Sequence, residues 1–420
     1  MINHASQSGS TPAKAYFLVG AMCIAQVLGM LGVFAFPALL PHFIQLWDLT
    51  NSQAGWISGI YFAGYSIAVP VLTSLTDRID SRKIYIISCF VGMIANIGFS
   101  LFSQGFWSAL ILRALCGIGL AGTFIPGLKA LIDRLEIRFL PRAIAFYTAC
   151  FGLGMSVSFY YAGVMFKWLG WKIVFYVAAA CSGFALVLCL VILVPRPLER
   201  DESTTPGLLS TLDFRPVWQN STTRAYIIAY MCHMWEMFAA RSWMVAFLTF
   251  AITLHADPTP FMAPTTVMAV AGIFGMIASI VFGELAVKFG RRRVVSFVMT
   301  ISGIFGLGLG FLAGVPYPAL VCLCIGYTVF FQGDSAAIHA GVITSADPER
   351  RGITMALQSV AGFAAASLSP IAVGFVLDRT GGGNTSISWG FTFGAMAITA
   401  FLGLFLLMKT KNLDNLYVTK

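Results

Sequence analysis

The chain has 420 residues, of which 58% are hydrophobic and only 10% are charged. Soluble domains carry about 25% charged residues, and a soluble fold of this size has no core large enough to hide so much apolar surface. The composition therefore excludes a soluble enzyme, a nucleic-acid-binding domain and a disordered chain.

Twelve apolar runs follow one another along the chain, and each is long enough for a bilayer span, which needs about 20 residues. The runs are continuous rather than alternating, so a β-barrel is not favoured. We predict an all-α membrane protein with twelve transmembrane helices. The runs cover residues 16–44, 54–76, 83–103, 106–133, 142–167, 171–194, 223–250, 263–287, 294–314, 317–343, 351–377 and 386–409.

The positive charges indicate how these helices are oriented. With the N-terminus inside, 21 of the 26 Lys and Arg fall on the inner side and three on the outer side, namely Lys167, Lys172 and Arg379. The remaining two, Arg113 and Arg241, lie within helices. Because cytoplasmic loops collect Lys and Arg, we expect both termini to be cytoplasmic, in a multi-pass protein of a bacterial inner membrane.

The longest polar segment, 195–223, divides the chain into two halves. We expect six helices in residues 1–194, a cytoplasmic linker over 195–223, and six helices in residues 224–420. All nine cysteines lie in apolar runs, where a free thiol behaves as a small hydrophobe. Neither a disulfide framework, nor a cofactor, nor a resident metal is expected.

The two halves carry matching loops. Residues 75–83 read LTDRIDSRK after the second run, and residues 283–293 read GELAVKFGRRR after the eighth, at an offset of 210 residues. This pair resembles the signature G-x-L-a-D-R-x-G-R-[RK] of the major facilitator superfamily. The first copy departs from it at Thr73 and Asp80, and the second has Val287 in place of the Asp. The matching positions are Leu75, Asp77, Arg78 and Arg82 in the first copy and Gly283, Leu285, Ala286, Gly290, Arg291 and Arg292 in the second.

The resemblance implies two six-helix bundles that rock about a central cavity. It assigns a gating role at the cytoplasmic helix ends to Asp77, Arg78, Arg82, Arg291 and Arg292. The alternative is that these charges only anchor helix ends at the anionic inner leaflet.

Two helices bear on the type of transporter that the resemblance implies. Arg113-Ala-Leu-Cys-Gly117-Ile-Gly119 resembles the family's R-x-x-x-G-x-G element in the fourth helix. The fifth helix reads GLGMSVS over 152–158, without the Gly-Pro element of drug antiporters. That difference argues against a drug antiporter.

Few charges lie within the predicted helices, and such charges are costly and usually functional. They are Arg113, Glu236, Arg241 and Asp334, accompanied by His233, His339 and the polar Gln26. In the family's arrangement helices 1, 4, 7 and 10 line the cavity, and all of these residues fall on those helices.

The seventh run carries three of these side chains. His233, Glu236 and Arg241 fit an arc of about 140° at 100° per residue, so one helix face can present them together. We interpret Glu236 and Asp334 as proton carriers, and Arg113 and Arg241 as partners of an anionic substrate, because guanidinium pairs with carboxylate or phosphate. The alternative is internal pairing in a purely structural role, with Arg241 bound to Glu236 and Arg113 bound to a neighbouring polar group. Further candidate substrate contacts are Gln26, His233, Tyr230 and Trp235.

The leading hypothesis is a secondary active transporter of a small anionic organic solute, coupled to protons and acting as a monomer in the bilayer. The alternative is a proton-driven exporter of amphipathic or cationic compounds. A metal transporter built on Cys232, His233 and Met234 is disfavoured, because adjacent residues point apart and Arg241 repels cations. Neither a nucleotide-binding loop nor an enzymatic motif is present, and the short tails do not favour a sensor.

Overall fold

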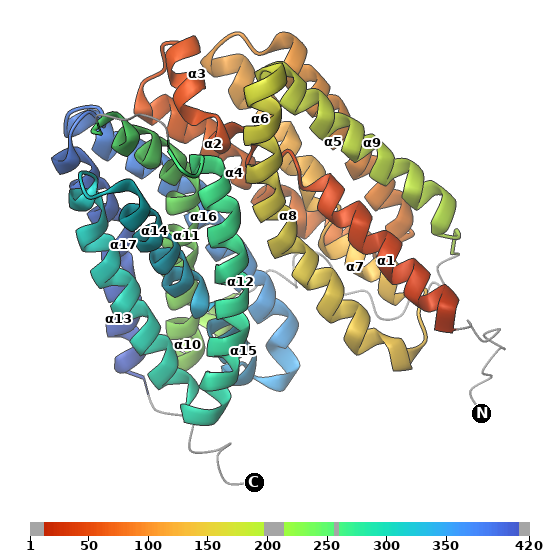
Figure 1. Cartoon of the computed structure of the whole chain (residues 1–420). Coiled ribbons are helices and arrows are strands. Elements are labelled where there is room, and N and C mark those ends of the chain that lie inside the picture. Colours follow the sequence, from red (N-terminus) through yellow and green to blue (C-terminus); the bar gives the residue numbers. More distant parts are fainter. Residues whose placement is uncertain (1–11, 197–213, 256–259, 411–420) are drawn as a thin grey trace, which may run out of the picture.

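The computed structural model describes residues 12–196, 214–255 and 260–410, and every regular element in these ranges is a helix (Figure 1). The predicted all-α fold is confirmed for this part of the chain. The predicted linker 195–223 lies mostly outside the described residues, and its described part includes the short helix α10 (Arg215–Gln219).

Helices α1 to α9 pack mainly on one another and are called the N-terminal bundle. Their ends follow local signals: Thr50 and Gln53 form a capping box at the start of α4, and Asp80 caps α5. The elements are α1 (Pro12–Gly29), α2 (Ala35–Ala38), α3 (Leu40–Leu46), α4 (Asn51–Leu75), α5 (Ser81–Phe102), α6 (Phe106–Ala121), α7 (Ile125–Ile132), η1 (Ile137–Phe139), α8 (Leu140–Leu169) and α9 (Trp171–Ile192).

Helices α10 to α17 form the C-terminal bundle, with α11 at its centre. Asn220 caps α11 by accepting the backbone N–H groups of Thr222 and Thr223. After α10 the elements are α11 (Ser221–Thr253), α12 (Pro264–Phe289), α13 (Arg291–Leu309), η3 (Gly310–Leu312), α14 (Tyr317–Gly333), α15 (Ser335–Ser345), η4 (Pro348–Arg350), α16 (Arg351–Arg379) and α17 (Ser386–Met408).

By length and composition, the described residues contain 11 helical segments able to cross a membrane. The predicted seventh span, α11, is not among them, although its 33 residues reach about 50 Å. Its polar residues lower its hydropathy, and most of its residues are buried by neighbouring helices. A helix enclosed by protein on all sides does not need the apolar surface that lipid requires.

Three predicted runs are broken rather than continuous. The first run becomes α1, α2 and α3, with irregular backbone over residues 30–34. The fourth is interrupted at residues 122–124, and the tenth ends its first helix at Gly333, so that Asp334 separates α14 from α15. Backbone groups freed by such breaks need polar partners inside a membrane protein, and the breaks therefore position functional side chains.

The two bundles meet along two helix pairs, α4 with α16 and α8 with α12. Glycine makes the first contact close: a Cβ on Gly55 or Gly59 of α4 would overlap backbone of α16, and one on Gly374 of α16 would overlap backbone of α4. On the second pair, a Cβ on Gly163 or Gly272 would overlap a side chain of the other helix. Small residues allow helix backbones to approach in this way.

A carboxylate joins the bundles where α4 begins and α16 ends, here called the latch end. Oδ1 of Asp378 accepts hydrogen bonds from N and Nδ2 of Asn51, both at 2.9 Å. Oδ2 accepts from N of Ser52 at 2.8 Å and from its Oγ at 2.5 Å. The carboxylate also sits at the positive end of the α4 dipole, which stabilises it.

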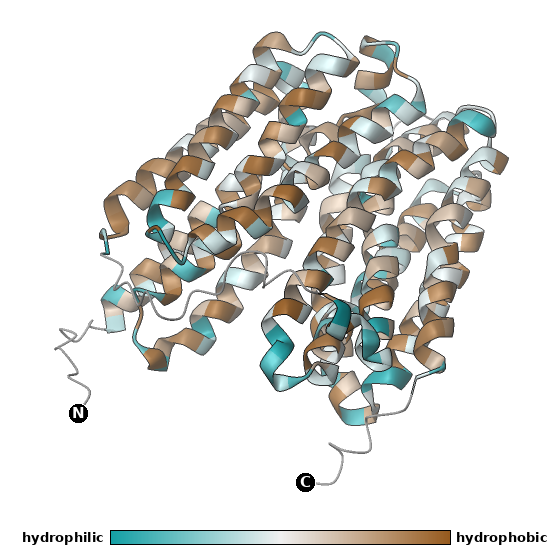
Figure 2. Cartoon of the chain, turned by 180° about the vertical axis from the view of Figure 1, so that it is seen from behind, coloured by the Kyte–Doolittle hydropathy of each residue, from teal (hydrophilic) through white to brown (hydrophobic). Residues whose placement is uncertain are grey.

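The opposite end, where α1 begins and α17 ends, is called the terminal end. The bundles diverge toward it in Figure 1. The hydrogen bonds that join the bundles in the described residues lie at the latch end and at Arg241, in the interior. Apolar residues cover the outer helix faces, and polar residues gather at both ends (Figure 2), which is the pattern of a protein surrounded by lipid.

Candidate functional site

Arg241 is the charged group at the junction of the two bundles. It lies on α11 and is 5% exposed. Its Nη1 donates to Sδ of Met155 on α8 at 2.6 Å, and its Nη2 donates to Oε1 of Gln332 on α14 at 2.7 Å. Thioether sulfur is a weak acceptor, and none of the described ion pairs involves Arg241. The site thus holds a buried cation with neutral partners.

Aromatic rings surround this guanidinium on both bundles. Its carbon lies 5.8 Å from the ring centre of Phe34 and 6.0 Å from that of Phe238. Phe238 packs edge-on against Phe62 of α4, with ring centres 4.4 Å apart. Phe363 of α16 lies 4.4 Å from Tyr65 of α4. The cation is therefore enclosed by an apolar wall that the two bundles share.

Glu236 is buried inside the C-terminal bundle, away from Arg241. Its Oε1 accepts the hydroxyl of Ser302 on α13 at 2.7 Å. The described ion pairs do not include one between Glu236 and Arg241. The alternative that Arg241 is neutralised by Glu236 is therefore wrong for this conformation, and so is the expectation that His233, Glu236 and Arg241 act from one shared face.

His233 instead meets Asp334. Nδ1 of His233 lies 2.7 Å from Oδ1 of Asp334, and the two side chains are 0% and 4% exposed. Asp334 stands between α14 and α15, so the break in the tenth run aims its carboxylate at α11. The contact is one of distance and charge: Nδ1 and Nε2 of His233 and Oδ1 of Asp334 are all buried without a hydrogen bond in the described residues.

A mostly polar group extends from this pair toward α15 and α16. The ring of Tyr230 lies 6.0 Å from that of His233 and 6.1 Å from that of His339. Nδ1 of His339 is 2.9 Å from Nε2 of Gln358. Tyr230 is half-buried and His339 is exposed. Trp235 points elsewhere, since its indole N–H donates to the backbone oxygen of Ala395 on α17.

Arg113 holds the break in the first predicted run. It is fully buried, and its Nη1 and Nη2 donate to the carbonyl oxygens of Gly32 and Val33 at 2.8 and 2.7 Å. Its guanidinium carbon lies 4.3 Å from the ring centre of Tyr61. Ser158 of α8 adds a hydroxyl that donates to the carbonyl of Leu31. In this conformation Arg113 satisfies backbone groups rather than facing a cavity.

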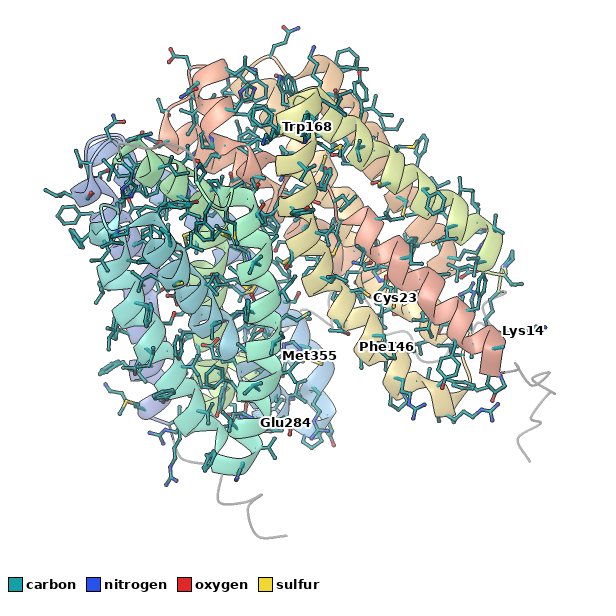
Figure 3. The ribbon with its side chains drawn as sticks, viewed as in Figure 1. Lys14, Cys23, Phe146, Trp168, Glu284 and Met355 are labelled. Carbon is teal, nitrogen blue, oxygen red and sulfur yellow. The ribbon has the colours of Figure 1, made fainter. Side chains whose placement is uncertain are left out.

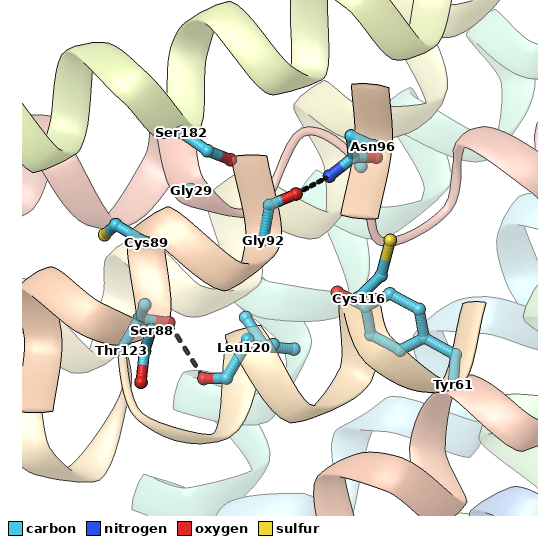
Figure 4. A pocket seen from close by; sticks show the side chains of 12 residues that line it. Gly29, Tyr61, Ser88, Cys89, Gly92, Asn96, Cys116, Leu120, Thr123 and Ser182 are labelled. Carbon is cyan, nitrogen blue, oxygen red and sulfur yellow. Dashed lines mark hydrogen bonds between the residues drawn. The ribbon is translucent and has the colours of Figure 1, made fainter. Parts of the chain in front are cut away.

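Gln26 is likewise buried in the N-terminal bundle. Its Oε1 accepts the hydroxyl of Tyr147 at 2.8 Å, while its Nε2 has no partner in the described residues. A small pocket lies nearby between α4, α5, α6 and α9, lined in part by Ser88, Asn96 and Ser182 (Figure 4). The amide of Asn96 donates to the carbonyl of Gly92 there.

The predicted gating residues do not join the two bundles. Asp77 and Arg78 are exposed, and in the described residues neither side chain forms a hydrogen bond or ion pair. Arg82 donates to the carbonyl of Leu190 on α9, and Arg292 to the carbonyls of Met408, the last residue of α17, and Thr410. Arg291 donates to Thr344 at 2.6 Å. The arginines thus close helix ends within their own bundles.

The acid that forms an ion pair in the first loop is Asp80, which stands where the family signature has Gly. Its carboxylate accepts two hydrogen bonds from Nη2 of Arg134, at 2.9 and 3.0 Å. Burial raises the pKa of Asp80, but the backbone N–H of Arg196, the Arg134 guanidinium and the N–H of Arg82 together lower it below its usual value. An Asp directly before a predicted helix is a typical N-cap, so this position of Asp80 could have been recognised from the sequence.

Three further residues were not identified from sequence: Asp378, Met155 and Gln332. Asp378 stands near the end of its run, where an acid is unremarkable, and its partners are 326 and 327 residues away. The described residues contain no group of three or more His, Cys, Asp or Glu side chains that could hold a metal ion.

Comparison with known proteins places this geometry in a family. The model described as Major Facilitator Superfamily matches residues 22–338 and 227–415. An uncharacterized MFS-type transporter of Bacillus subtilis, YceJ, is 23% identical over 83% of this chain and 86% of its own length. The cis,cis-muconate transport protein of Acinetobacter baylyi is 23% identical over 82% of each chain.

A solved structure has the same fold. It is a bacterial homolog of the human lysosomal transporter Spinster in an inward-facing and occupied conformation. The TM-score is 0.76 at 14% identity, over 97% of this chain and 99% of that one.

Proposed function

The chain belongs to the major facilitator superfamily and is a multi-pass membrane transporter of organic solutes, not an enzyme, and we propose that its substrate is a small organic anion whose transport is coupled to protons. The observation that carries the proposal is Arg241: a buried guanidinium at the junction of the bundles whose partners are a thioether and an amide. A substrate carboxylate or phosphate would replace these neutral partners with a charge-assisted, two-pronged contact.

One relative supports this substrate class, because muconate, for which it is named, is an organic anion. A cationic substrate is disfavoured, since it would have to approach an unneutralised guanidinium in a low-dielectric site. This argues against the alternative of an exporter of cationic compounds.

The arrangement of the bundles supports alternating access. We propose a twelve-span protein with the terminal end in the cytoplasm, in which the six helices of 1–194 move against the six of 224–420. In that orientation the latch end is the outer end, closed by Asp378, and the conformation is inward-facing. The excess of Lys and Arg on the inner side supports the orientation, and a bacterial inner membrane and a monomeric state are part of the same proposal.

The two buried acids of the C-terminal bundle are the candidates for the proton carrier. Glu236 and Asp334 lie in an interior with neither Lys nor Arg paired to them in the described residues. A charged group in such a place is costly, and acids found there are usually functional. Proton binding there would supply the driving force for uphill movement of the anion.

Transport assays in proteoliposomes test the substrate class. The probes are radiolabelled cis,cis-muconate, benzoate and glycerol phosphate, with tetraphenylphosphonium as the cation. We expect uptake of at least one anion by the parent, loss of that uptake in Arg241→Gln, and retention in the control Arg379→Gln, which removes an exposed arginine. Uptake of the cation alone, or full activity of Arg241→Gln, would overturn the proposal.

The orientation has its own test. Cys introduced at Asn384, an exposed residue at the latch end, should react with an impermeant thiol reagent in intact cells. Cys introduced at Glu349, at the terminal end, should react only after the membrane is opened. The reverse pattern would refute the proposed topology.

A further inference from the structure

The contact between His233 and Asp334 is the one buried acid–base pair formed within the described residues of the C-terminal bundle. We propose that this pair binds the coupling proton and passes its state to the anion site through the break between α14 and α15. The inference rests on the proposed function, and it assigns the proton to the pair rather than to Glu236.

The net charge of the His233–Asp334 pair depends on whether it holds a proton. Without a proton, the carboxylate and neutral imidazole carry a net charge of −1 in a place where both side chains are at most 4% exposed. With one proton, the pair is neutral overall. Because an uncompensated charge is costly in a dry interior, the neutral state of the pair favours the dry surroundings seen here, and the charged state favours a conformation in which water reaches it. Imidazole is the side chain whose charge changes most readily between pH 5 and 8.

The His233–Asp334 pair has a route by which a proton can reach it. Tyr230 lies beside the buried ring of His233 and beside the exposed ring of His339, and Gln358 contacts the latter at 2.9 Å. These groups lead from the pair toward the terminal end. The hydroxyl that Glu236 accepts belongs to Ser302, which is itself only 1% exposed.

The side chains that contact Arg241 and His233 lie close together in the sequence. Gln332, which holds Arg241 at 2.7 Å, ends α14 only two residues before Asp334, which holds His233. A movement of the break when the pair gains or loses its proton would therefore change the contact made by Arg241. The proton and the anion are linked through this short piece of backbone.

Few other titratable groups face the pair. From α11 they are Tyr230, Cys232 and Glu236, and Asp334 acts electrostatically on the latter two. Tyr327 of α14 stands beside Glu236, and His339 of α15 was described above. The charged residues of α12, α13 and α16 lie within two turns of a helix end: Glu284, Lys288, Arg291, Arg292, Arg293, Arg351, Asp378 and Arg379.

The test needs no substrate, so its failure leaves the anion proposal standing. Spin labels at Phe146→Cys and Met355→Cys, two exposed positions on opposite bundles (Figure 3), report the separation at the terminal end. The native cysteines are replaced, and distances are measured between pH 5 and 9. One linked proton should change the equilibrium between short and long distances by up to about tenfold per pH unit, with long distances favoured at high pH.

Three variants decide which group is responsible. Asp334→Asn and His233→Gln should each remove the pH dependence. Glu236→Gln, which neutralises the competing candidate acid of this bundle, should retain it, and so should the control Glu284→Gln, which neutralises an exposed acid of α12. A pH-independent parent, a pH-dependent Asp334→Asn, or loss of the dependence in Glu236→Gln would overturn the assignment.

A second measurement avoids variants that fail to fold. In the unaltered protein with ring-¹⁵N histidine, a buried ring should change protonation over the same pH range as the distances, and it is identified as His233 by its lack of response to a water-soluble relaxation agent. A buried ring that stays constant across that range would equally overturn the proposal.

Discussion

Removal of the Asp378 latch should open the latch end. The carboxylate accepts four hydrogen bonds, from the backbone N–H and side chain of both Asn51 and Ser52, at 2.5 to 2.9 Å. Asp378→Asn keeps one oxygen and places an amide NH₂ where the other oxygen was. Two of the four bonds are therefore lost, and the rest are no longer charge-assisted.

The size of the effect follows from these contacts. A hydrogen bond to a charged group contributes about 1.5–3 kcal/mol, so two lost bonds set an upper limit of about 6 kcal/mol. Asp378 is exposed, and solvent screening reduces exposed charge interactions to well under half of that. We expect about 2 kcal/mol, which changes the ratio of closed to open latch ends by about 30-fold.

Distances between spin labels at Leu46→Cys and Ile387→Cys, exposed positions at this end of the two bundles, measure that ratio. Asp378→Asn should add a longer distance, while the control Asp48→Asn should not. Asp48 is an exposed acid near the same end with φ 47°, which Asn also tolerates. An unchanged distance in Asp378→Asn would refute the argument that this carboxylate holds the bundles together.

Three other substitutions have defined outcomes. Gly59→Val should open the latch end in the same label assay, because its Cβ would overlap backbone of α16, whereas Gly20→Val, with open space at its Cβ, should not. Arg113→Ala leaves two buried carbonyls unpaired at about 1–3 kcal/mol each, so thermal unfolding in detergent should occur at a lower temperature, and Arg113→Lys should be intermediate. Asp80→Asn should lower stability by about 2 kcal/mol through its lost pair with Arg134. Because the folded-state pKa of Asp80 is lowered, its contribution is present above the unfolded-state pKa and is lost as pH falls through the folded-state value, so the parent and variant stabilities should converge in acid.

The positions of the helices were predictable from sequence, because a bilayer imposes apolar runs of a fixed length. The breaks inside the runs were not. Residues 30–34 are as apolar as the helices around them, and their carbonyls can leave the helix because Arg113, some 80 residues later, supplies the missing donors. Only the fold brings those two segments together.

The side chains of α11 show which contacts could not be predicted from helix geometry alone. Spacing placed His233, Glu236 and Arg241 within one broad arc. That arc faces several neighbours at once: the break after α14 receives His233, α13 receives Glu236, and α8 and α14 receive Arg241. A helix surrounded by other helices has no single functional face. Side chains that are close in angle around its axis can therefore contact different neighbours.

In the proposed mechanism, the same arrangement determines how the proton and the anion influence each other. A direct ion pair between Glu236 and Arg241 would make the two ligands compete for one contact, and the structure does not form it. The groups that hold His233 and Arg241, Asp334 and Gln332, instead lie two residues apart at one helix break. Coupling therefore requires only that this break have two positions, one favoured when the pair holds its proton and the other when it does not. The coupling energy is the difference in free energy between these two preferences. A substitution that stiffens the break without touching either ligand, such as Gly333→Ala, would crowd Phe282 and should weaken the pH dependence of the bundle distances while leaving both binding groups in place.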